Sequence, residues 1–155
     1  DKQLKELGKQ IGHLTNSWGE YHEDFVALSV RKLARSLMKV KRFRGPRIPS
    51  YYNGKMREYD FIAVGIRNHR ETALVVSVKT KPRGDDIKSL RGAIKELGLY
   101  YPDTANAIKI AMMVYIRYDK DALRRVQRAG FYTANISDEV CTLTVPSGFK
   151  PKEFK

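Results

Sequence analysis

The sequence predicts an α/β protein, a mixed β-sheet flanked by helices, on three observations. Two apolar runs separated by a polar turn form a β-hairpin pattern over residues 58–79. Strand patterns alternate with helix patterns in the second half of the chain, which is typical of strands joined by helical crossovers. Two helix patterns precede the hairpin. The expected order is therefore α-α-β-β-β-α-β-α-β-β, a sandwich around a mixed sheet.

The first helix is predicted from apolar residues that recur at alternating spacings of three and four. They are Leu4, Leu7, Ile11, Leu14 and Trp18. Such a seam fits either a coiled-coil contact between two copies of the chain or a helix that lies on its own domain. The expected organisation is an N-terminal helix over residues 1–18, with a possible dimerisation seam, followed by one α/β domain over residues 19–155.

The remaining elements follow from periodicity and from turn residues. A second helix is expected over Trp18–Val40, and a loop over Phe43–Gly54 with a short strand at Ile48 or Tyr51–Tyr52. Hairpin strands are expected at Glu58–Val64 and Ala73–Lys79, and a third helix is expected from an Asp85 cap to Leu99. A strand at Ile108–Ile116 and a helix from Asp119 or Asp121 to Ala129 should follow. The chain is expected to end with strands at Phe131–Ile136 and Val140–Val145 and a loop-like tail.

Positive charge dominates the composition. The net charge is +13, and no acidic residue occurs between Phe25 and Arg57, a segment with ten basic residues. Such a field attracts polyanions, which are nucleic acids or anionic membranes, although a solvated basic face is the plain alternative. The expected nucleic-acid contacts are Lys39, Lys41, Arg42, Arg44, Arg47, Lys55, Arg57, Lys81, Arg83 and Lys88. Tyr51 and Tyr52, which lie among these cations, could stack on bases, but packing within the fold is the favoured interpretation.

Several other functions are disfavoured by what the sequence lacks. No apolar run approaches the length of a membrane span. Cys141 is the single cysteine, which excludes an internal disulfide and a Cys-rich zinc site and favours a cytoplasmic, reducing location. The three histidines have no metal-ligand spacing, and no glycine-rich phosphate loop is present. The expected partner is therefore nucleic acid, above all DNA, and not a membrane.

The hairpin carries the residues with the clearest chemical meaning. Asp60 heads the first apolar run, and Ser77 and Lys79 lie near the end of the second. Ser77 and Lys79 share a face because successive strand residues point to opposite sides. A carboxylate opposite a carboxylate–X–lysine pair is a way for a sheet to hold magnesium and a lysine beside a phosphodiester. Here Ser77 replaces the middle carboxylate, so the pattern is a nuclease scaffold that lacks one direct ligand.

The order of elements and four short motifs give the chain a family resemblance. The motifs are Gly19–Glu23, Glu58-Tyr59-Asp60, Ser77-Val78-Lys79 and the tail segment Val145–Pro151. In this order they resemble the PD-(D/E)XK nuclease-like superfamily, and more narrowly a group of uncharacterised bacterial and cyanobacterial proteins within it. The resemblance covers nearly the whole chain. It implies a restriction-endonuclease-like sandwich with an N-terminal helical extension.

The resemblance also implies roles for four residues. Asp60 would bind a divalent metal, magnesium or manganese, and Glu23 would be an accessory acid on the second helix. Lys79 would position the attacking water or hold a phosphate oxygen. Residue 77 would be glutamate, whereas this chain has Ser77, which is a poor magnesium ligand.

Three functions follow as hypotheses. The first is metal-dependent phosphodiester hydrolysis at a degenerate site. The second is a catalytically inactive nucleic-acid-binding module that keeps the basic surface. The third is a dimeric interaction module that uses the helix over residues 1–18.

Overall fold

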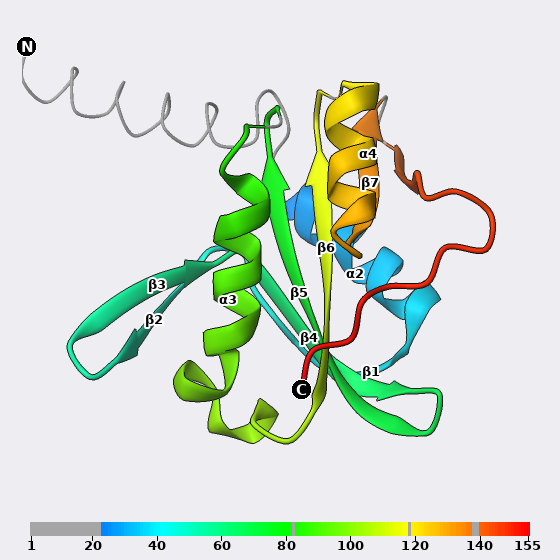
Figure 1. Cartoon of the computed structure of the whole chain (residues 1–155). Coiled ribbons are helices and arrows are strands. Elements are labelled where there is room, and N and C mark those ends of the chain that lie inside the picture. Colours follow the sequence, from blue (N-terminus) through cyan, green and yellow to red (C-terminus); the bar gives the residue numbers. More distant parts are fainter. Residues whose placement is uncertain (1–22, 82, 118, 138–139) are drawn as a thin grey trace, which may run out of the picture.

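The computed structural model describes residues 23–81, 83–117, 119–137 and 140–155. The expected helix over residues 1–18, its dimerisation seam and the domain boundary after residue 18 lie outside the described residues. Of the motif Gly19–Glu23, only Glu23 is described. The rest of the chain forms one mixed sheet, covered on both faces by helices, from which a second small hairpin projects (Figure 1).

The large sheet has six strands in the order β1-β4-β5-β6-β7-β8. Their bounds are Lys39–Arg44, Phe61–Arg67, Arg70–Lys79, Ile108–Tyr115, Tyr132–Ser137 and Val140–Leu143. β1, β4 and β5 form an antiparallel meander, β5, β6 and β7 run parallel, and β8 closes the sheet antiparallel to β7. The parallel pairs require crossovers, which the helices α3 and α4 supply. The predicted α/β fold with a mixed sheet is thus confirmed.

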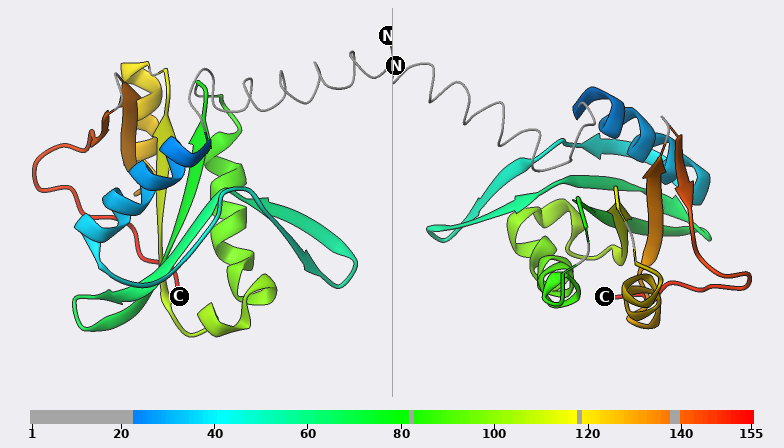
Figure 2. Two further views of the ribbon diagram at one scale, coloured as in Figure 1. Left: turned by 180° about the vertical axis from the view of Figure 1, so that it is seen from behind. Right: turned by 90° about the horizontal axis from the view of Figure 1, so that it is seen from above.

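The helices lie on both faces of this sheet (Figure 2). α2 (Glu23–Leu37) covers one face, and its buried residues pack with Phe61, Leu74 and Val76. α3 (Asp86–Tyr100) and α4 (Lys120–Arg128) cover the other face. Each face therefore has its own apolar core, and the alternation of side chains along a strand assigns each residue to one of the two.

The first strand of the sheet was not expected from the sequence. Helix was predicted to Val40 and loop from Phe43, whereas Lys39–Arg44 forms the edge strand β1. Its cationic side chains conceal the alternation, and lysines are common on edge strands because they discourage further pairing. Gly65 of β4 allows this pairing, since a Cβ there would clash with the main-chain oxygen of Lys39.

The predicted strand Glu58–Val64 is divided at Asp60. Its first part belongs to β3 (Lys55–Tyr59), which pairs with β2 (Ile48–Tyr52) to form a separate hairpin. Its second part is β4. The turn between β4 and β5 is also tighter than predicted, because it is made by Asn68 and His69 with positive φ angles of 53° and 64°. Such angles suit a two-residue hairpin turn.

The second half of the chain follows the prediction closely. β6, β7 and α4 lie within a few residues of their expected bounds, and Asp119 caps α4 by accepting a bond from the Asp121 N–H. β8 ends at Leu143, two residues earlier than expected. The tail returns to the sheet, where Phe154 bridges to Lys109 near the start of β6, before β6 begins to pair with β7. Among the described residues no helix is long and apolar enough to cross a membrane.

Candidate functional site

Asp60 lies in the single-residue gap between β3 and β4. Its carboxylate Oδ2 accepts the main-chain N–H of Val78 at 2.8 Å, across from the end of β5. Its main-chain oxygen accepts the N–H of Arg47 at 2.9 Å. Asp60 is thus fixed by two strands and by the segment that leads into β2.

Ser77 and Lys79 lie beside Asp60 on the last residues of β5. They alternate with Val76 and Val78, which belong to the core under α2, so they point to the α3 side of the sheet. The strand register places Phe61 opposite Val76, and the Asp60 carboxylate accepts the N–H of Val78, the residue between Ser77 and Lys79. The structure therefore brings Asp60, Ser77 and Lys79 to one place.

Burial raises the pKa of the Asp60 carboxyl to about 6. The hydrogen bond from Val78, and the charges of Lys79 and Arg47, act in the opposite direction, and Glu58 adds to the increase. The energetic cost of removing water from the ionised carboxylate is therefore larger than the stabilisation that its cationic neighbours provide. At neutral pH the folded protein therefore holds a carboxylate that is ionised at a cost in stability.

Replacing Asp60 with Asn is expected to stabilise the protein at alkaline pH. A raised carboxyl pKa means that wild-type stability falls as pH rises from about 4, the usual carboxyl pKa, to about 6. Above that window Asp60→Asn should be more stable by about 2 kcal/mol, and near pH 4 the two should be equal. Urea unfolding in the presence of a chelator measures this difference.

The control is Asp85→Asn, because Asp85 is exposed and its side chain makes no cap hydrogen bond. An equal gain in both variants, or a gain for Asp60→Asn that persists at pH 4, would contradict burial of the Asp60 charge.

Asp86 is a member of this site that the sequence did not reveal. Asp86 is only 5% exposed, and its Oδ1 lies 3.8 Å from the Lys79 Nζ. Oδ2 accepts the main-chain N–H of Arg83 at 2.7 Å. Asp85 occupies the N-cap position of α3, as the sequence predicted, but its side chain makes no cap hydrogen bond, and the Asp86 carboxylate makes the bond to the segment before the helix. The adjacent acidic pair, Asp85–Asp86, was the available signal.

Glu23 reaches Asp60 only through an arginine. α2 lies over the opposite face of the sheet, and Glu23 Oε1 is 3.4 Å from the Nε of Arg47. Arg47 in turn donates its main-chain N–H to Asp60. The geometry makes Glu23 a partner of Arg47 rather than of a shared ion, although both lie at the same end of the molecule as Asp60.

The oxygen donors at this site do not make up a magnesium site. Within the described ranges, no group of three or more histidine, cysteine or acidic side chains could hold a metal ion. Magnesium needs oxygen ligands in octahedral geometry. The Asp60 carboxylate already accepts the main-chain N–H of Val78. The Asp86 carboxylate pairs with the Lys79 ammonium and accepts the main-chain N–H of Arg83, and the Ser77 hydroxyl carries no charge. The expected magnesium or manganese ion stays a prediction.

The ten expected nucleic-acid contacts divide into two groups. Arg42 and Arg44 pair with Asp103, Arg47 with Glu23, and Arg57 with Glu96. These four cations connect elements of the fold. The other six are exposed and form no ion pair with any described carboxylate: Lys39, Lys41, Lys55, Lys81, Arg83 and Lys88.

The six unpaired cations lie in different parts of the molecule. Lys39 pairs with Ile66, six residues beyond Asp60 along β4, which is roughly 20 Å at 3.3 Å per residue. Lys81, Arg83 and Lys88 instead follow Lys79 along the chain and surround the start of α3. We call these three residues the site-end cations. The structure thus separates the site-end cations from those on β1.

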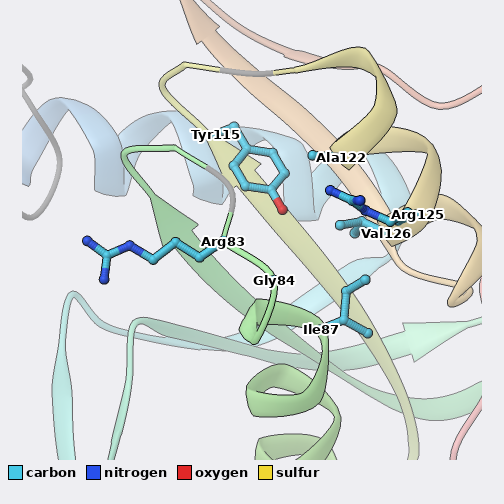
Figure 3. A pocket seen from close by; sticks show the side chains of 7 residues that line it. All are labelled: Arg83, Gly84, Ile87, Tyr115, Ala122, Arg125 and Val126. Carbon is cyan, nitrogen blue, oxygen red and sulfur yellow. The ribbon is translucent and has the colours of Figure 1, made fainter.

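A cavity of about 180 Å³ lies beside the site, between the start of α3 and α4 (Figure 3). Its lining is Arg83, Gly84, Ile87, Tyr115, Ala122, Arg125 and Val126. The side chain of Arg83 extends away from the other lining residues, and the Tyr115 hydroxyl points toward Ile87 and Arg125 (Figure 3). Burial raises the pKa of Tyr115, so this hydroxyl stays protonated. The lining contains no carboxylate, so it offers no metal ligands of that kind.

Cys141 is a free, partly buried cysteine on β8. Burial raises its pKa to about 12, so the nucleophilic thiolate is scarce at neutral pH.

Comparisons with known proteins gave no relative for this chain. No family model matches it, and neither the curated proteins nor the solved structures contain a match. The site itself is therefore the basis for assigning a function.

Proposed function

We propose that this protein binds nucleic acid, with the fold of a restriction-endonuclease-like nuclease whose cleavage site has lost a ligand. Binding uses the site-end cations around Lys79, and hydrolysis of the phosphodiester is absent or very slow. The observation that carries the proposal is that Asp60, Ser77 and Lys79 meet at neighbouring strand ends, beside the exposed site-end cations, where the described acidic, histidine and cysteine side chains form no group that could hold a metal ion.

The arrangement of strands supports the nuclease-like fold. β1, β4 and β5 form an antiparallel meander, and α3 leads from β5 to the parallel strand β6. Asp60 directly precedes β4, and Ser77 and Lys79 lie at the end of β5, so these residues meet at neighbouring strand ends. This is the order that the resemblance implies. An α/β sandwich hosts many functions, so fold alone does not assign this one.

The electrostatics of the site favour binding over cleavage. Lys79 already has a buried anionic partner in Asp86. A nuclease lysine acts on the attacking water or on a phosphate oxygen, and here that role competes with Asp86. Exposed cations, by contrast, need no further group to attract phosphates, because release of counterions supplies the affinity. The dimeric alternative concerns the helix over residues 1–18 and stays a prediction.

The test is to incubate the full chain with supercoiled and single-stranded DNA, with and without manganese. We expect retarded migration in a gel without nicking or degradation, in either condition. Manganese-dependent cutting that disappears in Asp60→Ala would contradict the proposed loss of cleavage. Cutting that persists in Asp60→Ala would indicate a contaminating nuclease instead. The absence of any retardation at low salt would remove the binding function altogether.

A further inference from the structure

We propose that the β2–β3 hairpin is an arm that enters a groove of double-helical nucleic acid. The arm is defined as Ile48–Tyr59, and it projects from the body of the protein (Figures 1 and 2). This inference depends on the proposed nucleic-acid binding and adds to it the form of nucleic acid and the element that contacts it.

One face of the arm is fixed to α3 and to the segment that follows it. The Tyr59 hydroxyl donates to the main-chain oxygen of Ala93 at 2.7 Å. Ser50 Oγ is 2.6 Å from the Tyr101 hydroxyl, and the Arg57 Nη2 is 3.1 Å from Glu96. Tyr52 packs edge-on against Tyr100, with ring centroids 6.0 Å apart. These contacts hold the arm in a defined direction without any partner.

The other face of the arm makes no such contacts with the part of the chain that the structure describes. Tyr51 and Met56 face one another in the strand register and are 71% and 59% exposed. Pro49 and Glu58 form the next cross-strand pair on this face, and both are exposed. Packing within the fold, the favoured interpretation of Tyr51 from the sequence, is therefore wrong for Tyr51. A fixed strand pair that exposes large apolar side chains is typical of a contact surface.

The dimensions and charge of the arm fit a groove. A two-stranded ribbon fits the major groove of DNA, and five residues per strand give roughly 17 Å, more than the groove depth of about 8.5 Å. The tip is narrow, since Asn53 and Gly54 make the turn with positive φ angles. Lys55, unpaired and exposed, follows this turn, so the tip is cationic. Apolar side chains on such a ribbon can contact thymine methyl groups or base steps.

The position of the arm connects it to the site. β3 ends at Tyr59, immediately before Asp60, and the N–H of Arg47, just ahead of β2, binds the Asp60 main-chain oxygen. The arm therefore joins the body of the protein beside Asp60, where β2 begins and β3 ends. A duplex held near the site-end cations would lie within reach of the arm.

The test compares Tyr51→Ala/Met56→Ala with Leu28→Ala, measured by fluorescence anisotropy with a labelled DNA duplex and with its single strand. Leu28 is the matched control because it is 55% exposed and lies on α2. We expect the double variant to bind the duplex about tenfold more weakly, with an unchanged salt slope, since no charge is removed. Lys55→Gln should instead reduce the salt slope by about one. Leu28→Ala should match wild type.

Each alternative outcome overturns the proposal in a recognisable way. If the wild-type protein binds duplex and the double variant binds it with the same affinity, the proposed role of the arm is refuted, while the proposed nucleic-acid binding is not. An equal loss for single-stranded DNA would indicate base stacking rather than groove insertion. A change in oligomeric state in sedimentation would assign the face to self-association. Failure of the folded parent to bind duplex would refute the proposed function and the arm together.

Discussion

Replacing Ser77 with Glu is expected to strengthen binding of manganese by at least about tenfold, because it adds the missing carboxylate beside Asp60. Ser77 is partly buried at the end of β5, on the same face as Lys79. A glutamate there also adds a negative charge next to a carboxylate that is already costly to ionise. Without metal the variant should therefore be less stable than wild type, and metal should restore the loss.

Calorimetric titration of manganese into wild type, Ser77→Glu and Ser77→Gln separates charge from size. Ser77→Gln has the length of glutamate and lacks its charge, so it should titrate like wild type. Identical titrations for the Glu and Gln variants would show that position 77 does not face a metal site. A titration repeated in an Asp60→Ala background should abolish the gain, since both carboxylates are needed.

Reversing two site-end charges is expected to weaken duplex binding about a hundredfold. The variant is Lys81→Glu/Lys88→Glu, which places two anions beside the start of α3. Each lost phosphate contact removes a released counterion, so the salt slope should fall by about two. Both lysines are exposed and form no ion pair with a described carboxylate, so the fold should survive the change.

The control for this variant is Lys39→Glu/Lys41→Glu on the edge strand β1. Both double variants lower the net charge from +13 to +9, because each replacement of lysine by glutamate removes one positive charge and adds one negative charge. Lys39 lies far along β4 from Asp60, so its variant should lose much less affinity. Equal losses in the two variants would mean that net charge alone attracts the nucleic acid, without a defined interface at the site end.

The sequence predicted the sheet best where apolar periodicity is strong. β6 is buried along nearly its whole length, so its apolar run alone identified it. β1 was not predicted, because its lysines and arginines are interrupted by only two apolar residues, Val40 and Phe43. The start of β3 was not predicted for a related reason: Lys55, Met56 and Arg57 are mostly exposed, so no side of this segment faces an apolar core. Strands outside a core leave little pattern in the sequence.

The site was predictable where it follows from strand alternation. Ser77 and Lys79 share a face because they are two residues apart, and pairing of β4 with β5 brings Asp60 beside them. Contacts made by long side chains between elements were not predictable. Arg47 separates Glu23 from Asp60, and Asp86 pairs with Lys79, through rotamers that local sequence does not determine. The same limit hid the ion pairs of the four arginines that were expected to contact nucleic acid.

The salt dependence of duplex binding by the full chain tests the central claim most directly. Anisotropy titrations at increasing salt should show tight binding near 50 mM salt, and log affinity should fall linearly with log salt with a slope steeper than about −2. Lys81→Glu/Lys88→Glu should flatten that slope. Absence of binding by the folded protein at low salt, or an affinity that does not change with salt, would contradict the account.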